Sequence, residues 1–254
     1  MFTYRHIIWL IICVVLIVLS LILIAKKKYT LTQVFTAGCV VSVLSELIKV
    51  FSVIEMVPSA DGSIVRPYIS NNHLPIHLCS LQILLIFYTR FTENKKMRES
   101  ILAFMYPSCI VGALAALLMP SIFSTTISVE QAFTHPIAYQ FFIFHTMLII
   151  LGISIAKSNE IDWDYKHIKA ALLIMFLLGF LSICVNSLLA SPTYVNGKLQ
   201  SVDFWTNFMF TYDNPIGIPM TKMWHWHVYL LILIGVVTIV VFLFYLPLIK
   251  RRKR

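Results

Sequence analysis

The chain has 254 residues, of which 59% are hydrophobic and only 12% are charged, and its formal net charge is +9. In a soluble domain of this length, roughly 25% of the residues would be charged. The composition therefore excludes an ordinary soluble domain and indicates a membrane protein.

Seven apolar segments follow one another along the chain, and a membrane-crossing helix needs about 20 mostly apolar residues. The segments are 6–25, 31–55, 74–91, 99–119, 136–156, 168–189 and 226–249. We predict an all-α polytopic membrane protein, a bundle of seven transmembrane helices that forms a single domain over residues 1–254. Because three lysines and no small-residue cleavage site follow it, we expect the first segment to be a retained helix and not a signal peptide.

Positive charge gathers in alternate loops. Most of the twenty lysines and arginines follow the first segment, lie between the third and fourth or the fifth and sixth segments, or form the C-terminal tail. Such loops mark the cytoplasmic side of a membrane. We therefore expect an outer N-terminus and a cytoplasmic C-terminus. The net charge reflects this topology and does not indicate nucleic acid as a partner.

Two loops expected on the outer side, 56–73 and 190–225, contain tight-turn dipeptides between β-prone residues. These dipeptides are Asp61-Gly62 and Asn196-Gly197. The aromatic end of the second loop predicts a cap over the outer mouth of the bundle, and an interfacial aromatic belt is the alternative.

Polar side chains inside apolar segments are costly and call for a partner or a function. The second segment places such residues, together with a glycine, on one helical face: Gly38, Ser42, Ser45, Glu46, Lys49 and Ser52. Glu46 and Lys49 are three residues apart and can pair. They form either a structural ion pair or a group in which Glu46 orients a histidine.

Seven of the eight histidines are expected at mid-membrane or on the outer side, and only His167 is expected on the cytoplasmic side. His145 lies near the middle of its segment, and Asn186 lies in the outer half of the next one. Histidines also occur at the outer ends of segments, among them His73, His77 and His225. This asymmetry predicts a polar cavity that opens toward the outer face.

Three kinds of chemistry fit such a cavity. Cys79 can act as a thiol nucleophile if a histidine activates it, and His145 is the candidate if the two helices pack together. His73 and His77 are four residues apart, a metal-ligand spacing, and zinc completed by His225 and His227 would make a hydrolase. A transporter, receptor or assembly factor would use the cavity without chemistry, and Cys79 would then be a buried structural residue.

Four stretches carry a family resemblance: "HLPIHLC" at 73–79, "QFFIFH" at 140–145, "TNFMF" at 206–210 and "MWHWHVYLLIL" at 223–233. From about residue 70 to its end, the chain resembles the YwaF-type bacterial integral membrane family. That family is similar to the eukaryotic transmembrane protein 164 family of phospholipid acyltransferases. The resemblance implies a bacterial cytoplasmic membrane protein in which Cys79 accepts an acyl chain and His145 assists it.

The resemblance also extends to membrane hydrolases of fatty-acid esters, so hydrolysis stays open beside acyl transfer. The "MWHWH" stretch departs from the Pro-Trp-Pro-Trp-like run of family members, and acceptor recognition is expected to differ accordingly.

We expect a lipid acyltransferase that moves an acyl chain from a phospholipid through Cys79 to a lysolipid or another acceptor, with His145 as general base and then acid. The expected supporting residues are Glu46 or Asn186 to orient His145, His77 and Asn207 to polarise the acyl carbonyl or contact the headgroup, and His73, Lys49 and His225 at the mouth. We expect no cofactor and no metal. The oligomeric state stays open, a homo-oligomer included.

Overall fold

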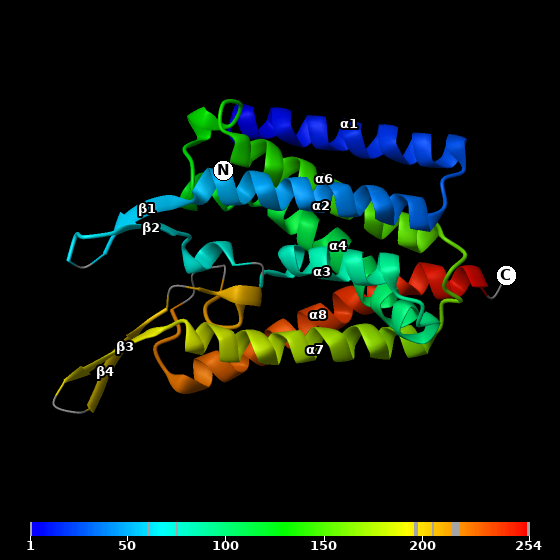
Figure 1. The fold of residues 1–254 in the computed structure, drawn as a ribbon. Helices are drawn as coiled ribbons and strands as arrows, with labels where there is room; N and C mark the ends of the chain where they lie inside the picture. Colours follow the sequence, from blue (N-terminus) through cyan, green and yellow to red (C-terminus); the bar gives the residue numbers. More distant parts are fainter. Residues whose placement is uncertain are drawn as a thin grey trace. The chain divides into compact units, whose positions relative to one another are not determined.

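The computed structural model describes residues 2–59, 61–74, 76–195, 198–204, 206–214 and 219–252, and most of them are helical (Figure 1). The long helices are α1 (Tyr4–Lys27), α2 (Leu31–Val53), α4 (Lys95–Leu118), α6 (Pro136–Lys157), α7 (Tyr165–Leu188) and α8 (Met223–Arg252). In the described part of the chain, these six are long and apolar enough to cross a membrane. A mostly helical, multi-pass membrane protein is therefore confirmed.

Helix α3 (Leu78–Phe91) is shorter than the others and begins four residues later than predicted. Its 14 residues extend about 21 Å, less than the ~30 Å hydrocarbon core of a bilayer. The chain before it forms a 3-10 turn, η1 (Asn71–His73), and then a tight turn in which the Ile76 amide donates to the Leu74 carbonyl at 2.8 Å.

Two β-hairpins form in the loops where turn dipeptides were found, so the fold is not purely α. The strands pair antiparallel as β1 (Glu55–Pro58) with β2 (Val65–Tyr68) and β3 (Ser191–Val195) with β4 (Lys198–Asp203). Gly62 adopts φ +71° in the first turn, a conformation that glycine tolerates best. The short remaining elements are α5 (Ile122–Thr125), η2 (Val129–Gln131) and η3 (Phe208–Phe210).

Contacts between Cα atoms divide the chain into two compact units. The first comprises Met1–His73 and Cys79–Ile161, and the second comprises Leu74–Leu78 and Asp162–Arg254. The expected single domain stays a prediction.

Helix α6 forms the core of the first unit, where α1, α2 and α4 pack against it. A Cβ added at Gly152 would lie 2.5 Å from Ile110 Cγ1 and 3.1 Å from the Tyr106 carbonyl oxygen, so α4 and α6 approach closely there. A Cβ at Gly38 would lie 3.2 Å from Leu151 Cδ1 and 3.5 Å from Ile86 Cγ2. The small residue at position 38 therefore lets α2, α3 and α6 meet.

Polar contacts attach α1 to the same core. His6 Nε2 lies 2.8 Å from the Leu117 carbonyl oxygen, and the Trp9 indole donates to the Ala132 carbonyl at 2.8 Å. The Trp9 ring also stacks on Phe142, with centroids 4.7 Å apart. Such bonds satisfy polar groups that lipid would leave unpaired.

In the second unit, α7 packs against α8 and contacts η3. The Trp163 ring meets Tyr245 of α8 edge-on, with centroids 5.5 Å apart. Tyr245 is fully buried, so this contact belongs to the core of the unit.

Candidate functional site

Cys79 is the second residue of α3 and is half-buried. Residues three and seven positions later, Gln82 and Ile86, are fully buried. Residues four and eight positions later, Ile83 and Phe87, instead line a groove against α2. On an α-helix, residues three and seven positions later lie to one side of a given residue, and residues four and eight positions later lie to its other side. Cys79 therefore lies at the boundary between the buried side of α3 and the side that faces the groove.

The groove has a volume of about 330 Å³ and is almost wholly apolar. Its α2 wall consists of Ser42, Val43, Glu46, Leu47, Val50 and Phe51. The α3 wall consists of Ile83 and Phe87, which lie about 6 Å apart along the helix axis. Cys79 does not itself line the groove but lies one helical turn, about 6 Å, before Ile83 on α3. The groove thus offers an apolar surface near the thiol, with the polarity that an acyl chain requires.

A polar cluster behind Cys79 links α3 to α4. Gln82 Nε2 donates to Ser108 Oγ at 3.0 Å, and the Cys109 thiol donates to Gln82 Oε1 at 3.3 Å. Ser108 in turn donates to the Phe104 carbonyl at 2.7 Å. This cluster was not predicted from the sequence, although the lone amide of Gln82 in the apolar run after Cys79 indicates a buried polar partner.

His145 is buried in α6 with its ring against Phe141 and Phe144, at centroid distances of 4.3 and 5.6 Å. Its Nδ1 lies 2.7 Å from the Phe141 carbonyl oxygen. Because a carbonyl oxygen only accepts, Nδ1 carries the proton of the neutral ring and Nε2 keeps its lone pair. This tautomer is the one a general base needs.

Helix α4 serves as a common reference for the depths of Cys79 and His145. Gln82 bonds to α4 at Ser108, and Gly152 meets α4 between Tyr106 and Ile110, so Gln82 and Gly152 lie at a similar level. Both α3 and α6 run antiparallel to α4 (Figure 1).

Cys79 precedes Gln82 by three residues and His145 precedes Gly152 by seven, so thiol and imidazole differ in depth by about one helical turn. Within the described residues, no hydrogen bond joins Cys79 to His145. The catalytic dyad therefore stays a prediction.

Glu46 and Lys49 form the ion pair that their spacing predicted, with Lys49 Nζ 2.7 Å from Glu46 Oε2. Glu46 also lines the groove. Its neighbour Ser45 accepts a hydrogen bond from Gln140 of α6 at 2.7 Å. His73 lies nearby in η1, where burial, followed by the positive charge of Lys49, lowers the pKa of the imidazole.

Other predicted residues lie in the second unit. The Asn186 side chain makes four hydrogen bonds of 3.0 to 3.2 Å, to Thr206 Oγ1, Phe208 N, Phe208 O and Thr211 Oγ1. The Asn207 amide bonds to the backbone of Tyr212 and Asp213. Both asparagines therefore hold the 206–213 segment in place.

The histidines of the "HLPIHLC" motif do not share one helical face, so that part of the zinc hypothesis is wrong. His73 belongs to η1, whereas His77 lies in a bend before α3, with its ring edge-on to Phe208 at 4.6 Å. His225 Nδ1 is buried and has no hydrogen-bond partner among the described residues. Those residues contain no group of three histidine, cysteine or acidic side chains arranged to hold a metal.

Comparison with known proteins adds one finding. The sequence model of the TMEM164 family matches residues 1–245. No curated protein and no solved structure gave a significant match. The family match covers both helices that line the groove, as well as His145.

Proposed function

Because the chain belongs to the TMEM164 family, we propose that it is a membrane enzyme that transfers acyl chains between lipids through a thioester on Cys79. The position of Cys79 one helical turn from an apolar groove between α2 and α3 carries this proposal. We propose that an acyl chain lies in this groove with its carbonyl at the end nearest Cys79.

In the first step, Cys79 Sγ attacks the ester carbonyl of a phospholipid while His145 Nε2 takes the thiol proton. A carbon–sulfur bond forms, the ester carbon–oxygen bond breaks, and His145 returns the proton to the departing lysolipid oxygen. In the second step, the hydroxyl of an acceptor lysophospholipid loses its proton to His145 and attacks the thioester. The new ester carbon–oxygen bond forms, the carbon–sulfur bond breaks, and the Cys79 thiolate recovers the proton from His145.

The start of α3 supplies what the tetrahedral intermediate needs. The first four amides of a helix have no partner within the helix. Cys79 belongs to this first turn, so backbone N–H groups stand beside its thiol and can stabilise a developing oxyanion. We assign His77, which is exposed just before the helix, to headgroup contact.

The short length of α3 fits this role in the membrane. We propose that α3, with the residues before it, is a seventh membrane-inserted helix whose N-terminus lies below the outer surface. The N-terminus of the chain would then lie outside and the C-terminus inside, as the basic loops indicate. We assign the protein to a bacterial cytoplasmic membrane on the strength of the sequence resemblance.

The test supplies purified protein in lipid nanodiscs with a phospholipid that carries an isotope-labelled acyl chain and with an unlabelled lysophospholipid. We expect label in the acceptor, no transfer by Cys79→Ala, and a loss of about 100-fold or more in His145→Ala. Cys184→Ala, which removes an exposed cysteine of α7, should retain transfer.

Two outcomes would contradict the proposal. Label that appears only as free fatty acid would make the protein a hydrolase. No Cys79-dependent turnover of any phospholipid would favour transport or binding.

A further inference from the structure

A second groove lies at the opposite end of α2, where the C-terminal ends of α1 and α6 meet the start of α2. Its volume is about 480 Å³. Leu21, Ile24 and Val34 form part of an apolar wall, and Lys28 and Lys157 stand at the polar rim. The lining thus changes from apolar to cationic, as the membrane does between its hydrocarbon core and its headgroups.

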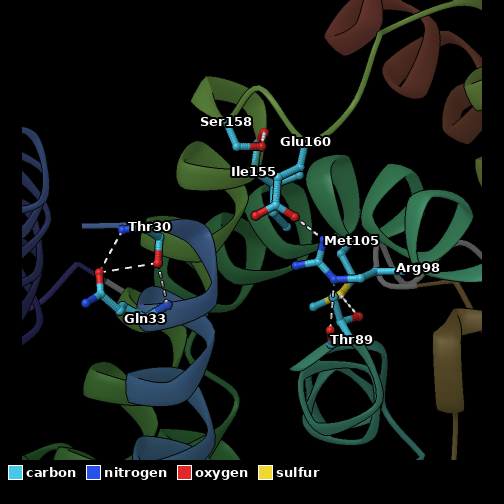
Figure 2. Close-up of polar contacts among 8 residues, drawn as sticks. All are labelled: Thr30, Gln33, Thr89, Arg98, Met105, Ile155, Ser158 and Glu160. Carbon is cyan, nitrogen blue, oxygen red and sulfur yellow. Dashed lines mark hydrogen bonds and ion pairs between the residues drawn. The ribbon is translucent and has the colours of Figure 1, made fainter. Parts of the chain in front are cut away.

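The rim carries uncompensated positive charge. Both lysine side chains are exposed, and within the described ranges neither forms an ion pair. The acidic residue at the rim, Glu160, is already paired with Arg98 of α4, which also donates to the Thr89 carbonyl at 3.0 Å (Figure 2). An anion that enters the groove therefore meets two free ammonium groups and a neutralised carboxylate.

The helix ends at this groove do not cancel that charge. The Tyr29 amide donates to the Ile24 carbonyl of α1 at 3.1 Å, and the Ser158 amide donates to the Ser154 carbonyl of α6 at 3.0 Å. The Ser158 hydroxyl caps a further carbonyl, that of Ile155, at 2.9 Å (Figure 2). Several of the carbonyls that would repel an anion are therefore occupied.

The polar side of the groove also offers a helix start. Thr30 and Gln33 cap α2 reciprocally, each side chain accepting a hydrogen bond from the other's backbone amide (Figure 2). The positive end of the α2 dipole thus points toward the groove that Lys28 and Lys157 border. Both contributions favour a negatively charged ligand.

We propose that this groove binds the phosphate headgroup of an anionic phospholipid, with the first part of an acyl chain against the apolar wall. The apolar wall favours a lipid over a soluble anion, which would leave that wall in contact with water. From Val34 to Glu46 the axis of α2 rises about 18 Å. The site is therefore separate from the acyl groove at Cys79 and faces the opposite leaflet.

The test uses the full chain in detergent and counts bound lipid by native mass spectrometry during titration with phosphatidylglycerol or phosphatidylcholine. We expect the wild-type protein to prefer phosphatidylglycerol. Lys28→Gln combined with Lys157→Gln should weaken that binding roughly 25-fold, about fivefold for each lysine near a lipid surface. Lys95→Gln combined with Lys96→Gln removes the same charge from exposed positions at the start of α4 and should leave binding unchanged.

Further variants keep the inference testable if the glutamine pair fails to fold. The matched pair of lysine-to-arginine substitutions should retain binding, and Val34→Phe should reduce it by filling the groove with the charge intact. Equal affinity for both lipids, equal loss in the two glutamine pairs, or full binding by Val34→Phe would overturn the proposal. If millimolar inorganic phosphate displaces bound phosphatidylglycerol as effectively as unlabelled lipid does, the site binds a soluble anion instead.

Discussion

Substitution of Asn186 by alanine should release the 206–211 segment from α7. The asparagine is almost completely buried, and four hydrogen bonds join its side chain to Thr206, Phe208 and Thr211. Alanine removes all four and leaves the buried Phe208 amide without its acceptor.

The magnitude follows from the number and burial of these bonds. A typical hydrogen bond contributes about 1 kcal/mol, and an orphaned buried donor costs about 1–3 kcal/mol. We therefore expect Asn186→Ala to lower the local opening free energy by about 3 kcal/mol.

Hydrogen–deuterium exchange with mass spectrometry measures this opening directly. At about 1.4 kcal/mol per factor of ten, amides of the 206–211 peptide should exchange about two orders of magnitude faster in Asn186→Ala. Asn159→Ala is a matched control, because it removes an exposed asparagine from the other unit. Unchanged exchange at 206–211 in Asn186→Ala would refute the assignment of Asn186 as the residue that holds this segment.

Three further predictions concern packing, pH and an ion pair. Gly152→Ala should destabilise the protein by roughly 1–3 kcal/mol, because its Cβ would overlap α4. Gly179→Ala should be nearly neutral, because no atom lies within 4 Å of the added Cβ. Equal melting temperatures of Gly152→Ala and Gly179→Ala in detergent would contradict this difference. Burial and a nearby ammonium group lower the pKa of His73, so the folded state binds fewer protons than the unfolded chain below about pH 6.5. The melting temperature should therefore fall as the pH drops through this window. If the melting temperature of His73→Gln depends on pH as steeply as that of the wild type, the prediction is wrong. In a double-mutant cycle, Arg98 and Glu160 should couple by less than about 1 kcal/mol because both are partly exposed, and a much larger coupling energy would refute this.

Local sequence signals predicted the features that depend on nearby residues. Apolar run lengths located the six long helices, because a span must satisfy its backbone internally over a fixed thickness. The spacing of Glu46 and Lys49 predicted their ion pair. Hairpins form in both loops that contain the turn dipeptides, although the all-α expectation included no strands.

Features that depend on contacts between distant segments were not predictable in this way. The bond between Gln82 and Ser108 requires knowledge of which face of α4 meets α3. The contact between His6 and the Leu117 carbonyl joins residues 111 positions apart. The late start of α3 depends on competition between a short apolar run and the turn before it, which hydropathy alone does not resolve.

The central claim is that Cys79 carries an acyl chain as a thioester, and the mass of the intact protein tests it most directly. Protein incubated with phospholipid and no acceptor should gain one acyl chain, and hydroxylamine should remove it. The adduct should persist in Cys184→Ala and be absent from Cys79→Ala. Wild-type protein that turns over phospholipid without this adduct, or an adduct of equal amount in Cys79→Ala, would contradict the account.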